Sequence, residues 1–262
     1  MRMGATVELD EVDRVYGNVQ ALSPTTKRLE PGTFTTLVGP SGCGKSTLLD
    51  IIAGLNTGNG GQALINGQPI KGPRRDTGVI FQEAAVLPWR TVLDNTAFAL
   101  EVQKVPVKKR REIAEDVLRR VGLSHFAGHY PHQLSGGMRQ RVAIARVLST
   151  DPDLVLADEP FGALDEQTRV VLGLELLRVV RQTDATVLFV THSIQEAVLL
   201  SDRILVMGAR PGRILLDLPV DLPSERDPSL VGTPVATHLV EQIWSVLRSE
   251  AERALTEQGA KR

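Results

Sequence analysis

The sequence predicts an α/β fold in which helices cover both faces of a mostly parallel sheet. Short apolar runs recur along the chain, bounded by glycine or polar residues, and we expect buried strands at 34–38, 79–81, 154–157, 187–190 and 204–207. The runs at 154–157 and 187–190 lack polar alternation, which is typical of parallel strands buried on both faces. A long segment of helical periodicity, 88–149, separates the second run from the third.

Composition places the chain among ordinary globular proteins. Of its 262 residues, 42% are hydrophobic and 23% are charged, and the net charge is -1. These values differ from those of intrinsically disordered proteins and of basic proteins that coat nucleic acids. The single cysteine, Cys43, excludes an internal disulfide and fits a reducing compartment. No run approaches the roughly 20 apolar residues that cross a bilayer, and residues 1–10 lack the apolar core of a signal peptide. We therefore expect a cytosolic chain whose membrane role, if it has one, depends on partners.

The helical segment has the pattern of an inserted subdomain. Its apolar residues recur at helical spacing from Ile113 to Val121, and Gly122 is placed as a C-terminal cap. The basic start of this helix, 108–111, is more typical of a solvated face than of a membrane or nucleic-acid patch. We expect a main domain over 1–218 with a helical subdomain inserted at about 88–150.

The chain after Leu218 is expected to form a C-terminal extension over 219–262. A loop with four prolines comes first. Apolar residues then recur at helical spacing, which predicts an amphipathic helix carrying Leu239, Ile243, Val246 and Leu247.

A glycine-rich loop follows the first apolar run and precedes a helical pattern. Its sequence, Gly39-Pro-Ser-Gly-Cys-Gly-Lys45-Ser46-Thr47, is a P-loop in the context that this motif requires. Glycines let successive backbone N–H groups surround a phosphate, and the following helix adds its positive end. Lys45 should reach the β- and γ-phosphates, Ser46 should bind Mg²⁺, and Thr47 should make a secondary contact. The residues expected to line this site are Gly39, Ser41, Gly42, Cys43, Gly44, Lys45, Ser46 and Thr47.

Two adjacent carboxylates, Asp158 and Glu159, end the strand predicted at 154–157. Strand alternation directs their side chains differently, so they can have different roles in one site. Asp158 suits the Mg²⁺ shell, and Glu159 suits the positioning and polarising of an attacking water. Kinases, helicases and GTPases share these features, so a further motif is needed to separate the classes.

That motif is Leu134-Ser-Gly-Gly-Met-Arg-Gln-Arg141, which opens a helix. Ser135 can cap the helix, and Gly136 and Gly137 expose backbone N–H groups at its positive end. The sequence therefore predicts a second anion-binding helix terminus.

Leu-Ser-Gly-Gly followed by Gln140 resembles the signature motif of ABC ATPases, and the resemblance spans most of the chain. Tyr16 falls where that family places an aromatic residue against adenine, Gln82 at the glutamine loop, and His192 at the switch histidine. Ala163-Leu-Asp165 resembles the D-loop. The resemblance implies a P-loop NTPase core with a mostly parallel sheet, an antiparallel β subdomain and an inserted α-helical subdomain.

The family's mechanism implies that ATP with Mg²⁺ is held between two copies of the chain. One copy supplies the P-loop, and the other supplies Ser135, Gly136 and Gly137. Glu159 is expected to activate water for in-line attack, with His192 and Gln82 sensing the γ-phosphate and Mg²⁺. Cys43, beside Lys45 and the loop N–H groups, is expected to favour the thiolate.

The resemblance leaves three classes of ABC ATPase open: importer subunit, separate-chain exporter subunit and non-transport ATPase. A single compact copy without fused membrane spans favours the importer, and the runs 81–95, 161–168 and 210–214 are similar to ATPases of nitrate, sulfonate and taurine importers. Ser193 departs from the acidic residue common after the switch histidine. This resemblance implies membrane-spanning permease subunits, an external solute-binding protein and a peripheral place on the cytoplasmic face, without nucleic acid. Trp89 is expected either in the core or in the groove that receives the permease.

Overall fold

A computed structural model describes residues 4–209 and 211–259, and it confirms the predicted α/β class. A six-stranded sheet has the order β10-β9-β3-β8-β7-β6, in which every neighbouring pair is parallel except β9 and β10. Its strands are β3 (Phe34–Val38), β6 (Thr77–Ile80), β7 (Leu154–Asp158), β8 (Thr186–Thr191), β9 (Arg203–Gly208) and β10 (Arg213–Pro219). The five apolar runs all lie in this sheet, with the small difference that β6 ends before Phe81.

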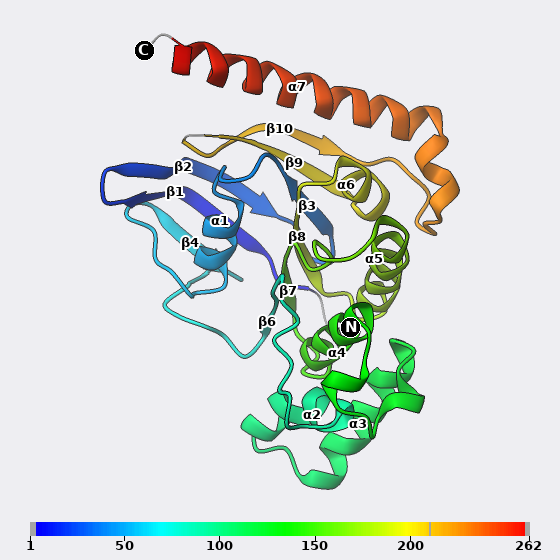
Figure 1. Cartoon of the computed structure of the whole chain (residues 1–262). Coiled ribbons are helices and arrows are strands. Elements are labelled where there is room, and N and C mark those ends of the chain that lie inside the picture. Colours follow the sequence, from blue (N-terminus) through cyan, green and yellow to red (C-terminus); the bar gives the residue numbers. More distant parts are fainter. Residues whose placement is uncertain (1–3, 210, 260–262) are drawn as a thin grey trace.

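An antiparallel sheet of four strands lies beside the first, in the order β2-β1-β4-β5. Its strands are β1 (Val7–Tyr16), β2 (Val19–Leu29), β4 (Gln62–Ile65) and β5 (Gln68–Pro69). Helix α1 (Lys45–Ile52) packs against β2 and β4 on one side and against β7 and β8 on the other (Figure 1). The helix that follows the P-loop is therefore fixed by both sheets.

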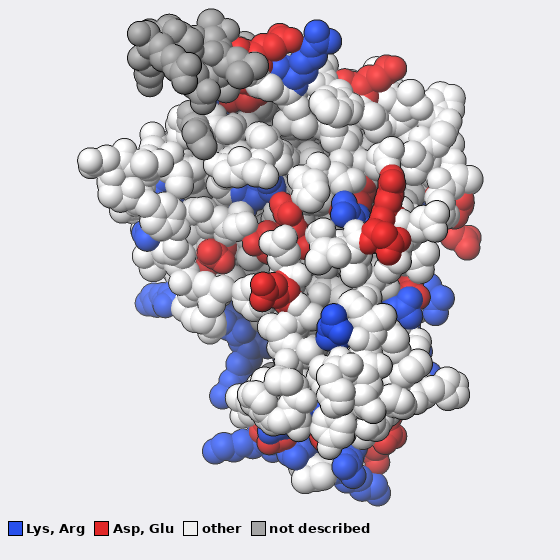
Figure 2. Space-filling view, in the orientation of Figure 1, with Lys and Arg blue, Asp and Glu red and all other residues white. Residues whose placement is uncertain are grey.

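The segment between β6 and β7 is helical, with α2 (Val92–Val102), α3 (Val107–Arg120), η1 (Ser124–Phe126), η2 (Pro131–Gln133) and α4 (Gly136–Leu148). Thr91 caps α2 by accepting a hydrogen bond from the Asp94 N–H. Helix α4 packs on α2 and α3 and also on β6, so it joins this region to the main sheet. Figure 2 shows basic side chains gathered over the lower, helical part of the molecule, where the start of α3 carries residues 108–111.

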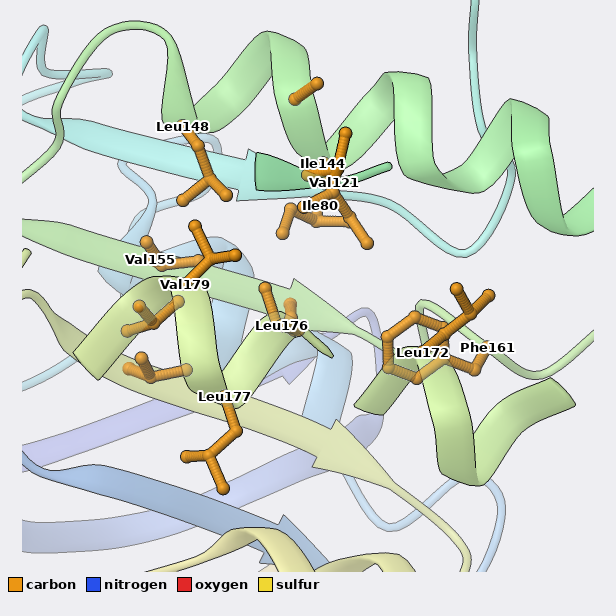
Figure 3. Packing of buried hydrophobic residues seen from close by; sticks show 14 of the residues in the cluster. Ile80, Val121, Ile144, Leu148, Val155, Phe161, Leu172, Leu176, Leu177 and Val179 are labelled. Carbon is orange, nitrogen blue, oxygen red and sulfur yellow. The ribbon is translucent and has the colours of Figure 1, made fainter. Parts of the chain in front are cut away.

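The largest apolar cluster lies between the sheet and the helices α4 and α5 (Glu166–Arg181). Ile80 of β6 and Val155 of β7 face Leu148 of α4 and Leu176 of α5, and all four are buried (Figure 3). Phe161, in the loop after β7, is 1% exposed and contacts Phe189 of β8. The loop that begins with Glu159, directly after Asp158 of β7, is thus anchored by a core aromatic ring.

The last part of the described chain covers the other edge of the sheet. After β10, a loop and η3 (Pro228–Gly232) lead to α7 (Pro234–Gly259), which packs on α6 (Ile194–Leu200), β9 and β10 (Figure 1). Ala236, Leu239 and Ile243 form its buried face. Arg210 and residues 260–262, which belong to the run 210–214 and to the expected extension, lie outside the described residues. Among the described helices, none combines the length and the apolar character that a membrane crossing requires.

Candidate active site

The P-loop begins directly at the end of β3. Gly42 and Gly44 have φ of +76° and +92°, a left-handed conformation that other residues adopt at a cost, so two glycines of the motif are required by backbone geometry. Gly39 is required by packing, because an ideal Cβ there would lie 2.3 Å from the carbonyl oxygen of Met207. The loop N–H groups and the start of α1 therefore form a fixed cradle for an anion.

Lys45 opens α1 and lies under the loop. Its side chain is 5% exposed, and its Nζ donates to the carbonyl oxygens of Gly39 at 2.9 Å and Pro40 at 3.0 Å. Nζ also lies 3.9 Å from Glu159 Oε1. This buried ammonium has carbonyl partners that it can exchange for phosphate oxygens.

Glu159 lies between Lys45 and His192. Its Oε2 is 3.1 Å from His192 Nδ1, on the turn that follows β8. Its own backbone has a φ of +43°, which is unusual for a non-glycine residue and marks local strain of about 1–3 kcal/mol. The Glu159 N–H donates to the Val190 carbonyl oxygen at 3.0 Å, so β8 holds the strained residue in place.

Asp158 is the last residue of β7 and lies near Ser46 at the start of α1. Burial raises the pKa of Asp158 above its ordinary value, and the neighbouring Ser46 side chain offsets only part of this rise. Burial, with a smaller contribution from the negative Asp158, also raises the pKa of Asp50 on α1. Two carboxyls beside a hydroxyl at the P-loop form an environment that a cation would stabilise.

Gln82 and the turn after Glu159 lie side by side. An ideal Cβ on Gly162 would lie 3.3 Å from Gln82 Nε2 and 3.7 Å from Glu159 Oε2. The glutamine amide, which comes from the loop after β6, is therefore close to the same carboxylate that His192 contacts. The structure brings together Lys45, Ser46, Gln82, Asp158, Glu159 and His192 from four separate segments of the chain.

Tyr16 is the last residue of β1, beside the turn that leads to β2. Its side chain is 43% exposed, the Arg14 guanidinium lies 4.6 Å from the ring centroid, and its hydroxyl accepts a hydrogen bond from Asn56 Nδ2 at 2.7 Å. One ring is thus held at the surface by two neighbours, in a position that a flat base could share by stacking.

The second predicted anion site lies on a different part of the chain. Ser135 caps α4, where its Oγ accepts from the Met138 N–H at 3.3 Å, and Ser135 and Gly136 are exposed. Helix α4 packs on α2, α3, α5 and β6, whereas α1 packs on β2, β4, β7 and β8. The N-termini of α1 and α4 therefore belong to helices that pack against different elements. Ser135 and Gly136 are exposed to solvent.

The expectation of a reactive thiolate at Cys43 was wrong. Its side chain is fully buried, and burial raises the pKa of the thiol more than the neighbouring Lys45 lowers it. Cys43 Sγ lies 4.0 Å from Lys45 Nζ inside the apolar cluster that packs around α1. The residue therefore fills space beneath the loop, and only its backbone can face a phosphate.

Trp89 is exposed, which decides between the two positions that the sequence left open. Its side chain is 71% exposed in the loop before α2, and Phe81 nearby in sequence is 46% exposed. The core position is excluded, and an aromatic surface remains beside the glutamine loop.

The sequence reasoning missed a buried network beneath His192. Glu196 on α6 is 7% exposed, accepts a hydrogen bond from the Thr191 hydroxyl, and lies with its Oε1 3.7 Å from Arg169 Nε. Arg169 also donates to the Leu164 carbonyl oxygen at 3.2 Å, in the loop that resembles the D-loop. Ser193-Ile-Gln-Glu196 has the Ser-x-x-Glu spacing of a capping box, and this signal could have directed attention to Glu196.

A P-loop on α1, a carboxylate pair at the end of the adjacent β7 and a buried lysine between them define a P-loop nucleoside triphosphatase. The family model described as "ABC transporter" matches residues 22–162. The chain is 49% identical to an uncharacterized ABC transporter ATP-binding protein of Methanocaldococcus jannaschii over 86% of both chains. The chain belongs to the ABC transporter family and is an ATP-binding ATPase of that family.

Two further relatives and one solved structure are informative. The taurine import ATP-binding protein of Rhizobium johnstonii is 42% identical, over 89% of this chain and 92% of its own. The nitrate import ATP-binding protein of Synechocystis is 42% identical, over 84% and 85%. The dimeric structure of MJ0796, a bacterial ABC transporter cassette, has a TM-score of 0.73 and 32% identity, and covers 83% of this chain and all of its own.

Proposed function

We propose that this chain is the ATP-hydrolysing subunit of an ABC importer, and that it powers the uptake of a small solute of the nitrate, sulfonate or taurine class. The observation that carries the ATPase assignment is the position of Glu159 between Lys45 and His192. The solute class rests on relatives that are named for taurine and nitrate import.

Glu159 is the group that activates water in the proposed reaction. A carboxylate at the mouth of the P-loop can accept a proton from water as the oxygen attacks the γ-phosphate. His192, 3.1 Å from this carboxylate, holds it in position and stabilises charge that develops on the γ-phosphate. Lys45 exchanges the carbonyl oxygens of Gly39 and Pro40 for phosphate oxygens when the nucleotide binds.

The donor set beside the P-loop fits Mg²⁺. Ser46, Asp158 and Gln82 offer hydroxyl, carboxylate and amide oxygens, the hard ligands that this ion takes together with substrate phosphates. Within the described residues there is no cluster of three or more histidine, cysteine or acidic side chains that would suit an all-protein metal cage. A Mg²⁺ ion bound with ATP would neutralise phosphate charge, and Ser46, Asp158 and Gln82 would hold it.

The complete site needs a second copy of the chain. The start of α4 is exposed or half-exposed at Ser135, Gly136 and Gly137, and α4 does not pack against the strands that hold α1. A partner that brings these residues over the P-loop would supply N–H donors and a hydroxyl to the γ-phosphate. A two-fold dimer would then contain two such sites, as a similar cassette of known structure is dimeric.

Mixing two inactive variants tests the shared site. Lys45→Ala disables one P-loop and Ser135→Arg blocks one α4 terminus. If each site takes one element from each copy, the mixed dimer keeps one intact site and hydrolysis returns in the mixture. Each variant alone should stay inactive. If the mixture stays as inactive as its components, although mass measurement shows mixed dimers, the shared site is excluded.

We further propose that the dimer docks on membrane-spanning permease subunits at the cytoplasmic face of the membrane, in a system with an external solute-binding protein. Trp89 and Phe81 are the exposed aromatic residues that would anchor the permease, because aromatic anchors dominate such interfaces. Co-purification of the tagged chain from membranes tests this: multi-span proteins should accompany the parent, and Trp89→Ala should reduce their yield. Ribosomes or DNA in their place would contradict a transport role.

A further inference from the structure

A cavity lies between the nucleotide site and helix α7. Its volume is about 960 Å³. One wall includes the P-loop rim from Gly39 to Ser41 together with Glu159 and His192, and the other is formed by α7, with the apolar Val240, Trp244, Leu247 and Ala251 beside the charged Arg248 and Glu250. The catalytic carboxylate and the C-terminal helix therefore share one open space.

The α7 wall contains a strip of apolar side chains, and a largely buried ion pair holds the helix in place. Val240, Trp244 and Leu247 line it, and Trp244 is 60% exposed although neighbouring turns of the same helix carry the buried Leu239 and Ile243. Glu250, 7% exposed, accepts two hydrogen bonds from Arg213 Nη2 of β10, at 3.0 and 3.1 Å. Within the part of the chain that the structure describes, most of the Trp244 side chain stays exposed on an anchored helix, so a large apolar surface is in contact with water.

The occupant of this cavity must also lie over the catalytic residues. Ser41, Glu159 and His192 belong to the wall, and these residues need a cover that excludes water and adds donors during hydrolysis. The body proposed to cover them is a second copy of the chain. Because Ser41, His192 and Trp244 line one cavity, a partner that covers Ser41 and His192 comes beside Trp244.

We propose that α7 is part of the ATP-dependent dimer interface, with Trp244 as its apolar anchor against the second copy. This inference rests on the shared site proposed above. In a two-fold dimer each copy contributes the same patch, so two Trp244 side chains are buried for each pair of ATP molecules. Helix α7 then contacts the second copy only when the sites are closed. The Arg213–Glu250 ion pair links α7 to β10 and transmits the effect of this contact to that strand.

Fluorescence quenching isolates the two tryptophans, because the chain contains only Trp89 and Trp244. The Trp89→Phe, Glu159→Gln variant reports Trp244, and the Trp244→Phe, Glu159→Gln variant reports Trp89. Acrylamide quenching and sedimentation are measured on the same samples with and without MgATP. We expect quenching of Trp244 to fall at least threefold when the dimer forms, while Trp89 stays accessible.

The two measurements separate the possible failures. A dimer that sediments as such while Trp244 remains fully quenchable overturns the role of α7 and leaves the shared site intact. A chain that does not dimerise with MgATP overturns both proposals. Shielding of Trp244 by anionic lipid vesicles, without shielding in the dimer, assigns the surface to a membrane and also overturns the inference.

A substitution measures the contribution of Trp244 to association. Trp244→Ala should weaken ATP-dependent dimerisation at least tenfold, while nucleotide binding by the isolated chain is unchanged. Val235→Ala is the matched control, because Val235 is exposed on the same helix and does not line the cavity. Equal dimerisation of Trp244→Ala and Val235→Ala would show that Trp244 does not anchor the dimer interface.

Discussion

Gly212 supports the P-loop from below, and its replacement tests that support. It follows the β9–β10 turn, and its N–H donates to the Ala21 carbonyl oxygen at 3.1 Å. An ideal Cβ at Gly212 would lie 2.2 Å from the Cys43 carbonyl oxygen of the P-loop and 2.8 Å from the Ala21 carbonyl oxygen. Both neighbours are backbone atoms, so a methyl group forces either the hairpin or the P-loop to move.

The size of the effect follows from the distances. Ordinary van der Waals contact begins at 3.4 Å, whereas the added Cβ would lie 2.2 Å from the Cys43 carbonyl oxygen. The two atoms must therefore move apart until their distance rises from 2.2 Å to 3.4 Å. Overpacking of this kind costs about 1–3 kcal/mol. Because about 1.4 kcal/mol corresponds to a tenfold change in affinity, Gly212→Ala should weaken ATP binding by about fivefold to somewhat over a hundredfold if the P-loop is the part that moves.

Isothermal titration with a non-hydrolysable ATP analogue and thermal unfolding provide the measurements. Gly128→Ala is the matched control, because none of the described residues comes within 4 Å of a Cβ at Gly128 and neither glycine has a positive φ. The control should bind and melt like the parent. Parental affinity together with a parental melting temperature in Gly212→Ala would refute the view that the hairpin fixes the P-loop.

Two further predictions concern buried titratable groups. Because burial raises the pKa of Cys43, its thiolate fraction at pH 7 is small, so maleimide should label the folded chain at least tenfold more slowly than the chain unfolded in urea; equal rates would contradict the burial. Burial also raises the pKa of Glu196, so the stability that this carboxyl contributes is present at low pH and is lost as the pH rises through its folded pKa. Glu196→Gln stays neutral and does not lose this stability, so the difference in melting temperature between variant and parent should shift in favour of the variant between pH 4 and pH 8. A shift in favour of the parent would contradict a raised pKa at Glu196.

The sheet could be predicted because its strands are unusually apolar. All five residues of β3 and all six of β8 are buried, so no polar alternation blurs the pattern. β10 could not be found in this way, because most of its residues are half-buried at the sheet edge. The face of α7 was visible in its periodicity, but its position beside the nucleotide site depends on the packing of α6 and β9 against it.

Sequence motifs predicted the site residues whose positions depend on local backbone geometry. They did not predict properties that depend on burial in the folded chain, such as the pKa of Cys43. The P-loop glycines and Lys45 follow from spacing, and the structure places them around one cradle. For Cys43 the sequence displays the neighbouring charge of Lys45 but not the apolar cluster that covers the sulfur. The contact of Glu196 with Arg169 joins α6 to α5, and such a pair becomes visible only when the helices are packed.

The assignment of Glu159 is tested most directly by comparing Glu159→Gln with Lys45→Ala. Glutamine keeps the size of the side chain but cannot accept the proton from water, whereas alanine at position 45 deletes a charge that meets the phosphates before any chemistry occurs. ATP affinity and steady-state hydrolysis are measured for both. We predict that Glu159→Gln binds ATP like the parent with hydrolysis reduced at least a hundredfold, and that Lys45→Ala loses binding itself. Near-parental hydrolysis by Glu159→Gln would show that another group activates the water.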